Sequence, residues 1–217
     1  MAQQSIIVID DFYDQPELVR EHALSLPFIR RPGYISYPGR EAVSPEGKWE
    51  DVKQRLRRLI DDPVDAPCPK DAPFRQGKFR LALQEDEGLR LDGVHQDVQR
   101  WSAVIYLSRA QDCRGGVSFY RHRQTGALAW GDDFERTFAP WAHLPTDEFG
   151  ANVRAHMRDL SNWEEYQRVG MAFNRAVLLM AQCFHGSTGI FGSSPETGRL
   201  TQHFEFYADE AKLEDGA

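Results

Sequence analysis

The stretch His95-Gln-Asp-Val-Gln-Arg-Trp-Ser-Ala-Val-Ile-Tyr-Leu-Ser108 places two potential metal ligands just before a strand-like run. His95 and Asp97 are two residues apart, and in extended backbone residues i and i+2 point to the same side. The β-branched and aromatic run Ala103–Leu107 then predicts a strand. A single strand end can therefore offer an imidazole and a carboxylate to one metal ion.

A third candidate ligand, His185, follows the apolar run 174–184, which predicts a buried strand. Two histidines and one carboxylate form the facial triad of non-haem Fe(II) oxygenases, which leaves metal positions open. Further on, Arg199 and Thr201 make a second i, i+2 pair. Arginine can grip a carboxylate with two parallel hydrogen bonds, and Thr201 can donate another beside it. The pattern predicts a metal site with an anion site nearby.

The ordered set His95-x-Asp97, His185 and Arg199-x-Thr201 resembles the Fe(II)/2-oxoglutarate-dependent dioxygenases. The segment from His95 to Tyr120 is particularly similar to the prolyl-hydroxylase-like branch, in which the HxD motif precedes a "YLN"-type strand and a Gly-Gly pair. The resemblance covers roughly residues 79 to 207. It implies an α+β, mainly β fold: a double-stranded β-helix, or jelly-roll and cupin-like barrel, with N-terminal helices packed on one sheet.

The resemblance also implies roles for the motif residues. His95, Asp97 and His185 would be the catalytic Fe(II) ligands, while Arg199, Thr201 and Tyr106 would hold the far carboxylate of 2-oxoglutarate. With O2, this chemistry releases succinate and CO2 and hydroxylates a C–H bond of the substrate by default. Desaturation and ring formation by the same class of enzyme stay open.

Two residues separate this chain from other branches of the superfamily. In the related halogenases a small residue replaces the carboxylate ligand, whereas Asp97 fills that position here. The nucleic-acid dealkylases usually carry a second arginine six residues beyond the first, and Glu205 stands there instead. A net charge of -7 also disfavours a phosphate-rich partner. We therefore expect no nucleic-acid substrate.

Length and composition favour one globular domain covering residues 1–217, with 41% hydrophobic and 12% aromatic residues. No run of about 18 apolar residues is present, which predicts no membrane span. The N-terminus lacks the pattern of a secretion signal. Three cysteines without CxxC spacing fit a reduced, cytoplasmic protein better than a disulfide scaffold or a zinc site.

The expected organisation has an N-terminal part, residues 1–73, and a β-helix core, residues 74–207. In the first part we expect a strand at 5–9, a helix opened by a capping box with Asp14 as N-cap and Glu17 at N3, and an amphipathic helix over 49–60. Residues 127–170 form a lid-like insertion with a helical stretch near 152–168. Its three tryptophans are Trp130, Trp141 and Trp163.

Other polar residues are expected to be structural. His22, His143 and His156 lack a ligand-type partner at a suitable spacing. The basic helix face, with Lys53, Arg55, Arg57 and Arg58, is more often solvated than bound to an anion or RNA. On the last strand Arg199, Thr201, His203 and Glu205 share one face, which should line the pocket. His203 is either a residue near the substrate or a hydrogen-bonded barrel histidine.

Two other kinds of protein compete with the oxygenase hypothesis. A cupin-like metal protein that does not use 2-oxoglutarate would keep the triad, but the Arg199-x-Thr201 pair argues against it. A non-catalytic barrel would be expected to lack a triad member, and none is missing. The substrate is a small molecule, such as an amino acid or a natural-product intermediate, more readily than a peptide, because the chain is compact and has no adaptor domain. The oligomeric state is not indicated.

Overall fold

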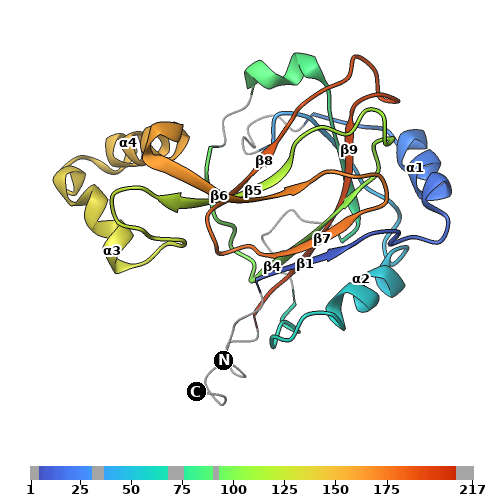
Figure 1. Ribbon diagram of the computed structural model, residues 1–217, viewed down its shortest axis with the longest axis horizontal. Helices are drawn as coiled ribbons and strands as arrows, with labels where there is room; N and C mark the ends of the chain where they lie inside the picture. Colours follow the sequence, from blue (N-terminus) through green and yellow to red (C-terminus); the bar gives the residue numbers. More distant parts are fainter. Residues whose placement is uncertain (1–4, 31–36, 68–75, 90–92, 209–217) are drawn as a thin grey trace.

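Two antiparallel sheets form the body of the protein (Figure 1). The computed structural model describes residues 5–30, 37–67, 76–89 and 93–208. The six-stranded sheet has the order β1 (Ile6–Ile9), β7 (Ala176–Met180), β4 (Trp101–Tyr106), β9 (Arg199–Phe206), β3 (Lys78–Ala82) and β2 (Arg40–Ala42). The three-stranded sheet has the order β6 (Trp163–Gly170), β5 (Gly116–His122) and β8 (His185–Thr188). The expected α+β class, mainly β, is confirmed.

The outer face of the large sheet is covered by two N-terminal helices. Along β4, Trp101, Ala103 and Ile105 alternate toward this side. There they join Ala23 of α1 (Pro16–Ser25) and Leu56 of α2 (Glu50–Arg57) in one buried cluster. The helices lie together on one side of the sheets in Figure 1. The prediction that N-terminal helices pack on a sheet is therefore correct.

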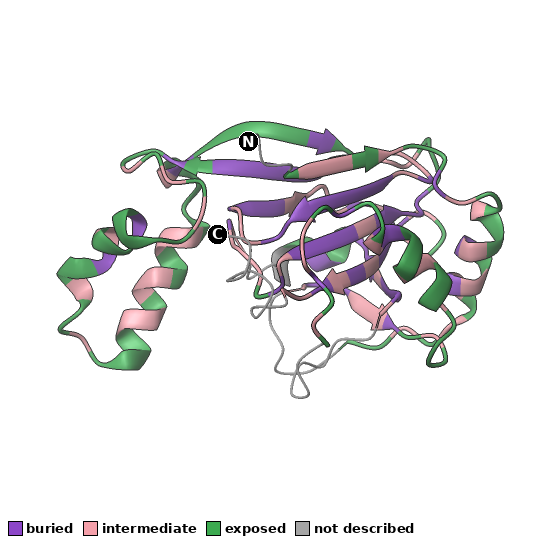
Figure 2. Cartoon of the chain, turned by 90° about the horizontal axis from the view of Figure 1, so that it is seen from below, coloured by how far each residue is buried: buried purple, intermediate pink, exposed green. Residues whose placement is uncertain are grey.

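The inner face of the large sheet packs against the small sheet. Tyr106 of β4 and Val177 of β7 meet Val117 and Phe119 of β5 in a second cluster. Figure 2 shows the layered strands, which contain most of the buried residues. On β9, Leu200 and the phenylalanines belong to the outer cluster. The polar positions of β9, at 199, 201, 203 and 205, therefore point toward the space between the sheets, as the alternation predicts.

The glycine pair before β5 is required by close backbone approach. Gly115 has φ +69°, and a Cβ on it would lie 2.2 Å from the carbonyl oxygen of Thr188. A Cβ on Gly116 would lie 2.0 Å from the carbonyl oxygen of Val169. Any larger residue would separate β5 from its two neighbours β8 and β6.

Two local predictions are wrong. Helix α1 has Gln15 as N-cap with no side-chain capping bond, because Pro16 occupies the first helical position and leaves Asp14 outside the helix. The helix expected near 152–168 ends at Arg158, and Trp163–Gly170 forms β6, paired with β5. The boundary expected at 73/74 and Cys68 lie outside the described residues. Cys113 and Cys183 are free thiols. No helix in the described ranges has the length and apolar character needed to cross a membrane.

Residues 127–162, between β5 and β6, form a helical unit that lies to one side of the sheets (Figure 1). It contains α3 (Asp132–Glu135), α4 (Thr146–Arg158) and the 3-10 turns Arg136–Trp141 and Leu160–Asn162. Phe134 and Phe138 pack with Trp163, Tyr120 and Phe184 in a third buried cluster. This aromatic core anchors the unit on the far end of the β5–β6 hairpin and close to His185, which follows Phe184.

Two histidines face each other inside this aromatic core. The Nε2 atoms of His122 and His156 are 3.1 Å apart, and His122 is only 1% exposed. The Nδ1 atom of His122 lies 2.9 Å from the hydroxyl of Thr125, and Asn162 Nδ2 lies 3.2 Å from Nδ1 of His156. The Asn162 amide nitrogen can only donate, so Nδ1 of His156 carries no proton and its Nε2–H donates to Nε2 of His122. In this arrangement both rings are neutral. His156 is structural, as expected, but its partner was not predicted.

We expect the His122–His156 pair to make the fold less stable as the pH falls below about 6.5, the usual histidine value. Burial lowers the pKa of both rings. The charge of His156 lowers the pKa of His122 further. The Asp159 carboxylate partly opposes the lowering of the His156 pKa. With folded-state pKa values below the unfolded one, the unfolded chain binds protons first, so acid favours unfolding. Urea titrations between pH 7.5 and 5.5 measure this loss.

The matched variants are His156→Gln and, as control, His143→Gln, which changes an exposed histidine of the same helical unit. The loss of unfolding free energy on acidification should shrink in His156→Gln and stay unchanged in His143→Gln. An equal acid sensitivity in all three proteins would contradict the assignment of the effect to this pair.

Candidate metal centre

The backbone brings His95 and His185 together before any side chain is considered. The amide of His95 donates to the carbonyl of His185 at 2.9 Å, and the amide of His185 donates back at 2.8 Å. The amide of Asp97 donates to the carbonyl of Ala181 at 2.8 Å. Main-chain hydrogen bonds thus hold the loop 93–97 against the β7–β8 turn. They keep the three residues in place although His95 and Asp97 lie outside regular strands and His185 is the first residue of β8.

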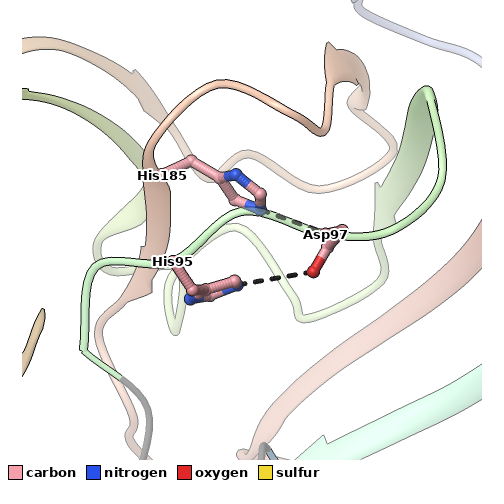
Figure 3. Close-up of side chains that lie close together, drawn as sticks. All are labelled: His95, Asp97 and His185. Atoms are coloured by element: carbon pink, nitrogen blue, oxygen red, sulfur yellow. Dashed lines mark ion pairs between the residues drawn. The ribbon is translucent and has the colours of Figure 1, made fainter. Parts of the chain in front are cut away.

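The three side chains converge on one point (Figure 3). One potential ligand atom from each of His95, Asp97 and His185 lies within 4.8 Å of the others. Nε2 of His95 is 3.8 Å from Oδ1 of Asp97, and Nε2 of His185 is 3.6 Å from Oδ2. The two imidazole centroids are 4.6 Å apart. The structure therefore assembles the predicted ligand set as a three-residue group.

The far nitrogens of both rings fix which atom faces this point. Nδ1 of His95 lies 3.1 Å from the carbonyl of Gly93, and Nδ1 of His185 lies 2.8 Å from the carbonyl of Cys183. A carbonyl only accepts, so each Nδ1 carries the proton and each Nε2 presents its lone pair. Metal-ligating histidines are oriented by contacts of this kind.

Asp97 is held from behind by a small polar network. Gln99 Nε2 donates to Oδ2 of Asp97 at 2.9 Å and to the hydroxyl of Ser102 at 2.7 Å. The Ser102 hydroxyl lies 3.4 Å from the same oxygen. Burial alone raises the pKa of the Asp97 carboxyl, but the imidazoles of His185 and His95 outweigh it, so the net pKa is lowered. The Asp97 carboxylate is therefore ionised at neutral pH, the form in which it could bind a metal ion.

Arg199 is a buried cation without an acidic partner in the part of the chain that the structure describes. It is 4% exposed, and no carboxylate of the described residues lies within 4.0 Å of its guanidinium. Its Nη2 reaches only the carbonyl of Gly116 at 3.4 Å, and its Nε makes no hydrogen bond with a described residue. A buried charge without compensation is costly, so this pocket is suited to an anion.

Three buried hydroxyls, two beside Arg199 and one on β8 opposite Gly116, also lack hydrogen-bond partners in the described part of the chain. They are those of Tyr106, Tyr37 and Thr188. The Arg199 guanidinium carbon lies 5.7 Å from the centre of the Tyr106 ring. Burial raises the pKa of Tyr106 and Tyr37, with Arg199 opposing the shift in both, so both phenols stay protonated and can donate. Tyr106 was predicted here; Tyr37 and Thr188 were not.

Thr201 and His203 lie beside this anion pocket on β9. The Thr201 hydroxyl is 2.8 Å from Nε2 of His203, so the two side chains form a hydrogen bond. Burial lowers the pKa of His203, and the charges of Arg80, Lys78 and Arg199 lower it further. Arg80, opposite Thr201 on β3, also lowers the pKa of Asp97. Arg199 reaches the carbonyl of Gly116, which pairs with Thr188 of β8, and His185 begins the same strand. The three-residue group and Arg199 therefore both lie against β8.

A family model with the description "Family of unknown function (DUF6445)" matches residues 1–206. The chain belongs to this family. The match spans both sheets, the helical unit and all six predicted site residues. Among curated proteins no match is found.

Several solved structures are similar to this family member. HygX from Streptomyces hygroscopicus, with nickel and 2-oxoglutarate bound, has 15% identity and a TM-score of 0.49 over 94% of this chain and 83% of HygX. The Fe(II)/(alpha)ketoglutarate-dependent dioxygenase TqaL has 11% identity and a TM-score of 0.43 over 94% and 83% of the two chains. The non-heme iron oxygenase OrfP, in complex with Fe and L-Arg, has 13% identity and a TM-score of 0.43 over 93% and 82%.

Proposed function

We propose that this protein is a non-haem Fe(II)/2-oxoglutarate-dependent oxygenase that hydroxylates a C–H bond of a small molecule. The observation that carries the proposal is the pairing of two features in one inner region. The His95, Asp97 and His185 group offers three ligands on one side, and the buried guanidinium of Arg199 has no acidic partner among the described residues. A metal site alone would not require that cation, whereas a dicarboxylate co-substrate explains both.

The three ligands suit an iron ion that must keep positions open. Neutral Nε2 atoms of His95 and His185 and one ionised carboxylate oxygen of Asp97 occupy one face of the site. No fourth histidine, cysteine or acidic side chain joins this group in the described ranges. Because structural metal sites usually supply four protein ligands, a set of three favours a catalytic site.

The remaining pocket residues would hold the distal carboxylate of 2-oxoglutarate. Arg199 neutralises its charge, and the protonated phenols of Tyr106 and Tyr37 are placed to donate hydrogen bonds to it. Thr201 lies on the same face of β9, opposite Tyr106 in the β4–β9 ladder. Anchoring this end fixes the direction of the molecule, so that its 2-oxo acid end is oriented toward the ligand group.

When bound, Fe(II) with 2-oxoglutarate and O2 supplies the oxidising chemistry: one oxygen atom enters the substrate C–H bond, the other enters succinate, and CO2 leaves. The task of the chain is to position the reactants. We further propose that the two sheets form a double-stranded β-helix within one domain, and that the helical unit of residues 127–162 acts as a lid beside the site.

Binding and turnover test the proposal together. Fe(II) with 2-oxoglutarate at about 100 times its Kd should stabilise the native state by about 2.7 kcal/mol, which for a chain of this size corresponds to a Tm rise of about 5 to 11 °C. Glutarate, which lacks the 2-oxo group, is the control and should raise the Tm less. Succinate should form slowly without substrate and faster with it. No Tm shift and no succinate at saturating Fe(II) and 2-oxoglutarate would refute the function.

Removing the support of Asp97 should weaken metal binding without removing a ligand. In Gln99→Leu, Oδ2 of Asp97 loses the donor that lies at 2.9 Å, while a side chain of similar size still fills the buried position. We expect about a 10- to 100-fold loss of Fe(II) affinity, the usual effect of removing such a supporting residue. Anaerobic calorimetric titration measures it. Ser102→Ala removes the longer 3.4 Å contact with Asp97 and an acceptor for Gln99, but it keeps the 2.9 Å bond from Gln99 to Asp97, so it should lose less. An equal loss in both variants would contradict this ranking.

A further inference from the structure

A surface hollow opens directly beside the metal-ligand group. It has a volume of about 250 Å3. His95 and Gln96 line one side, and Trp130, Arg154 and Met157 of the helical unit line the other. Sites for drug-sized ligands usually span about 300 to 1,000 Å3. A hollow of this size next to a metal ligand suits a molecule smaller than that.

Main-chain contacts hold the two walls of this hollow against each other. The amide of Val94 donates to the carbonyl of Met157 at 3.0 Å, and a Cβ on Gly93 would lie 2.4 Å from that carbonyl oxygen. The C-terminal turn of α4 is therefore pressed against the loop that carries His95. The shape of the hollow therefore depends on the packing of α4, because a movement of α4 would break its main-chain contact with Gly93 and Val94.

The aromatic wall is also fixed in place. The backbone amide of Trp130 donates to the side-chain oxygen of Gln96 at 3.0 Å. Its indole Nε1 donates to a carboxylate oxygen of Glu135 at 2.6 Å, and its ring stacks on Phe138 with the centroids 5.5 Å apart. Trp130 is still 38% exposed. These contacts hold the indole ring in one orientation, so that Trp130 and Met157 together line the hollow with apolar surface.

The charge in the hollow is positive. Arg154 is exposed, and none of the carboxylates in the described residues lies within 4.0 Å of it. Arg158, one helical turn further on, also lines the hollow. The acidic residues of α4, Asp147 and Glu148, are in its first turn, at the opposite end of the helix. The described residues that line the hollow include two arginines and no acidic side chain, and the nearby Glu135 carboxylate is bonded to the Trp130 indole. In a protein of net charge -7 this is a local cationic site beside His95.

We propose that the substrate is a small carboxylate-bearing molecule with an apolar or aromatic body. Arg154 holds the carboxylate, and Trp130 and Met157 pack against the body, which places a C–H bond of that body toward His95. This assignment rests on the proposed oxygenase function, since it names the substrate class of the same site. Arg154, Trp130 and Met157 then determine substrate specificity.

Matched probe pairs test the charge requirement without relying on turnover. N-acetyl-L-phenylalanine and N-acetyl-L-leucine are each titrated against the corresponding amide, using full-length protein loaded with Ni(II) and 2-oxoglutarate. Charge-assisted hydrogen bonds contribute about 1.5 to 3 kcal/mol when sheltered; because Arg154 is exposed, we expect the low end, about a tenfold preference for the carboxylate. Calorimetry measures each Kd.

Three variants locate the effect. Arg154→Gln should abolish the carboxylate preference, and Trp130→Ala should weaken both members of a pair alike. Arg136→Gln is the matched control: Arg136 belongs to the same helical unit, pairs with Asp133, and does not line the hollow, so the preference should persist. The proposal is overturned if no carboxylate binds more tightly than its amide, or if the preference survives in Arg154→Gln.

The two proposals fail in different ways. If the oxygenase assignment is wrong, the protein will not bind 2-oxoglutarate in a metal-dependent manner, whatever the probes do. If only the substrate assignment is wrong, metal and 2-oxoglutarate will bind normally, while the carboxylate and amide probes will bind equally. Titrating the metal-free protein with the same probe pairs shows whether the preference for the carboxylate depends on bound metal and 2-oxoglutarate.

Discussion

Replacing Arg199 with alanine should weaken binding of 2-oxoglutarate to the Fe(II)-loaded protein by roughly 30-fold to several thousand-fold. Truncating one partner of a buried charge pair costs about 2 to 5 kcal/mol, which converts to this range of Kd. Arg199 is 4% exposed and has no acidic partner in the described ranges, so no neighbouring charge is released to compensate. Fe(II) affinity should hardly change, because Arg199 is not a ligand.

An anaerobic titration of 2-oxoglutarate, followed by the metal-to-ligand charge-transfer band, measures the effect. Arg199→Lys should recover part of the affinity, because an ammonium keeps the charge but not the planar pair of donors. Arg121→Ala controls for net charge, since Arg121 is exposed and pairs with Glu164 at the surface. An unchanged Kd in Arg199→Ala would mean that the co-substrate is anchored elsewhere or is not 2-oxoglutarate.

The metal-ligand group was predictable because its signal is local. His95 and Asp97 carry it in a two-residue spacing, and His185 follows an unmistakable apolar run. The sequence could not show how the loop and the turn meet. That depends on the reciprocal amide bonds between His95 and His185 and the bond from Asp97 to Ala181, which involve main-chain atoms that every residue has.

The residues of the proposed anion pocket could be predicted only in part. Arg199 and Tyr106 stand out because they match positions in a motif and a strand. Tyr37 lies in a Pro-, Gly- and Ser-rich loop without periodicity, so nothing local distinguishes its hydroxyl from that of a surface tyrosine. Only the folded chain brings Tyr37 near Arg199 and leaves the Tyr37 hydroxyl and Nε of Arg199 without hydrogen-bond partners among the described residues.

The errors in secondary structure have tertiary causes. In β6, Trp163-Glu-Glu-Tyr-Gln-Arg-Val-Gly170, only the residues at 163 and 169 are buried. A segment this polar, rich in glutamate, glutamine and arginine, favours a helix by intrinsic propensity. Pairing with β5 along its whole length overrides that preference. The helix cap failed for a simpler reason: Pro16 fixes the first helical residue, and the expected cap at Asp14 is one position too early.

Loss of either histidine ligand should abolish Fe(II)-dependent succinate formation. Removing a ligand should cost more than the roughly 10- to 100-fold in metal affinity expected for removing a residue that only supports one. The two variants should differ in stability. The His95 side chain is 33% exposed, so His95→Ala should leave the metal-free Tm nearly unchanged, whereas the His185 side chain is 7% exposed. His185→Ala also leaves the Cys183 carbonyl without its 2.8 Å donor, at a cost of about 1 to 3 kcal/mol.

This difference separates a catalytic loss from a folding loss. His95→Ala should retain the native near-UV circular dichroism and unfolding midpoint of the metal-free protein while failing to bind Fe(II) in calorimetry, because the reciprocal bonds with His185 use only main-chain atoms. His143→Ala, which removes an exposed histidine of the helical unit, should keep full activity. Near-normal succinate formation by His95→Ala or His185→Ala would remove the metal assignment. If His95→Ala kept its fold and its Fe(II) affinity but lost activity, His95 would act on the substrate rather than on the metal.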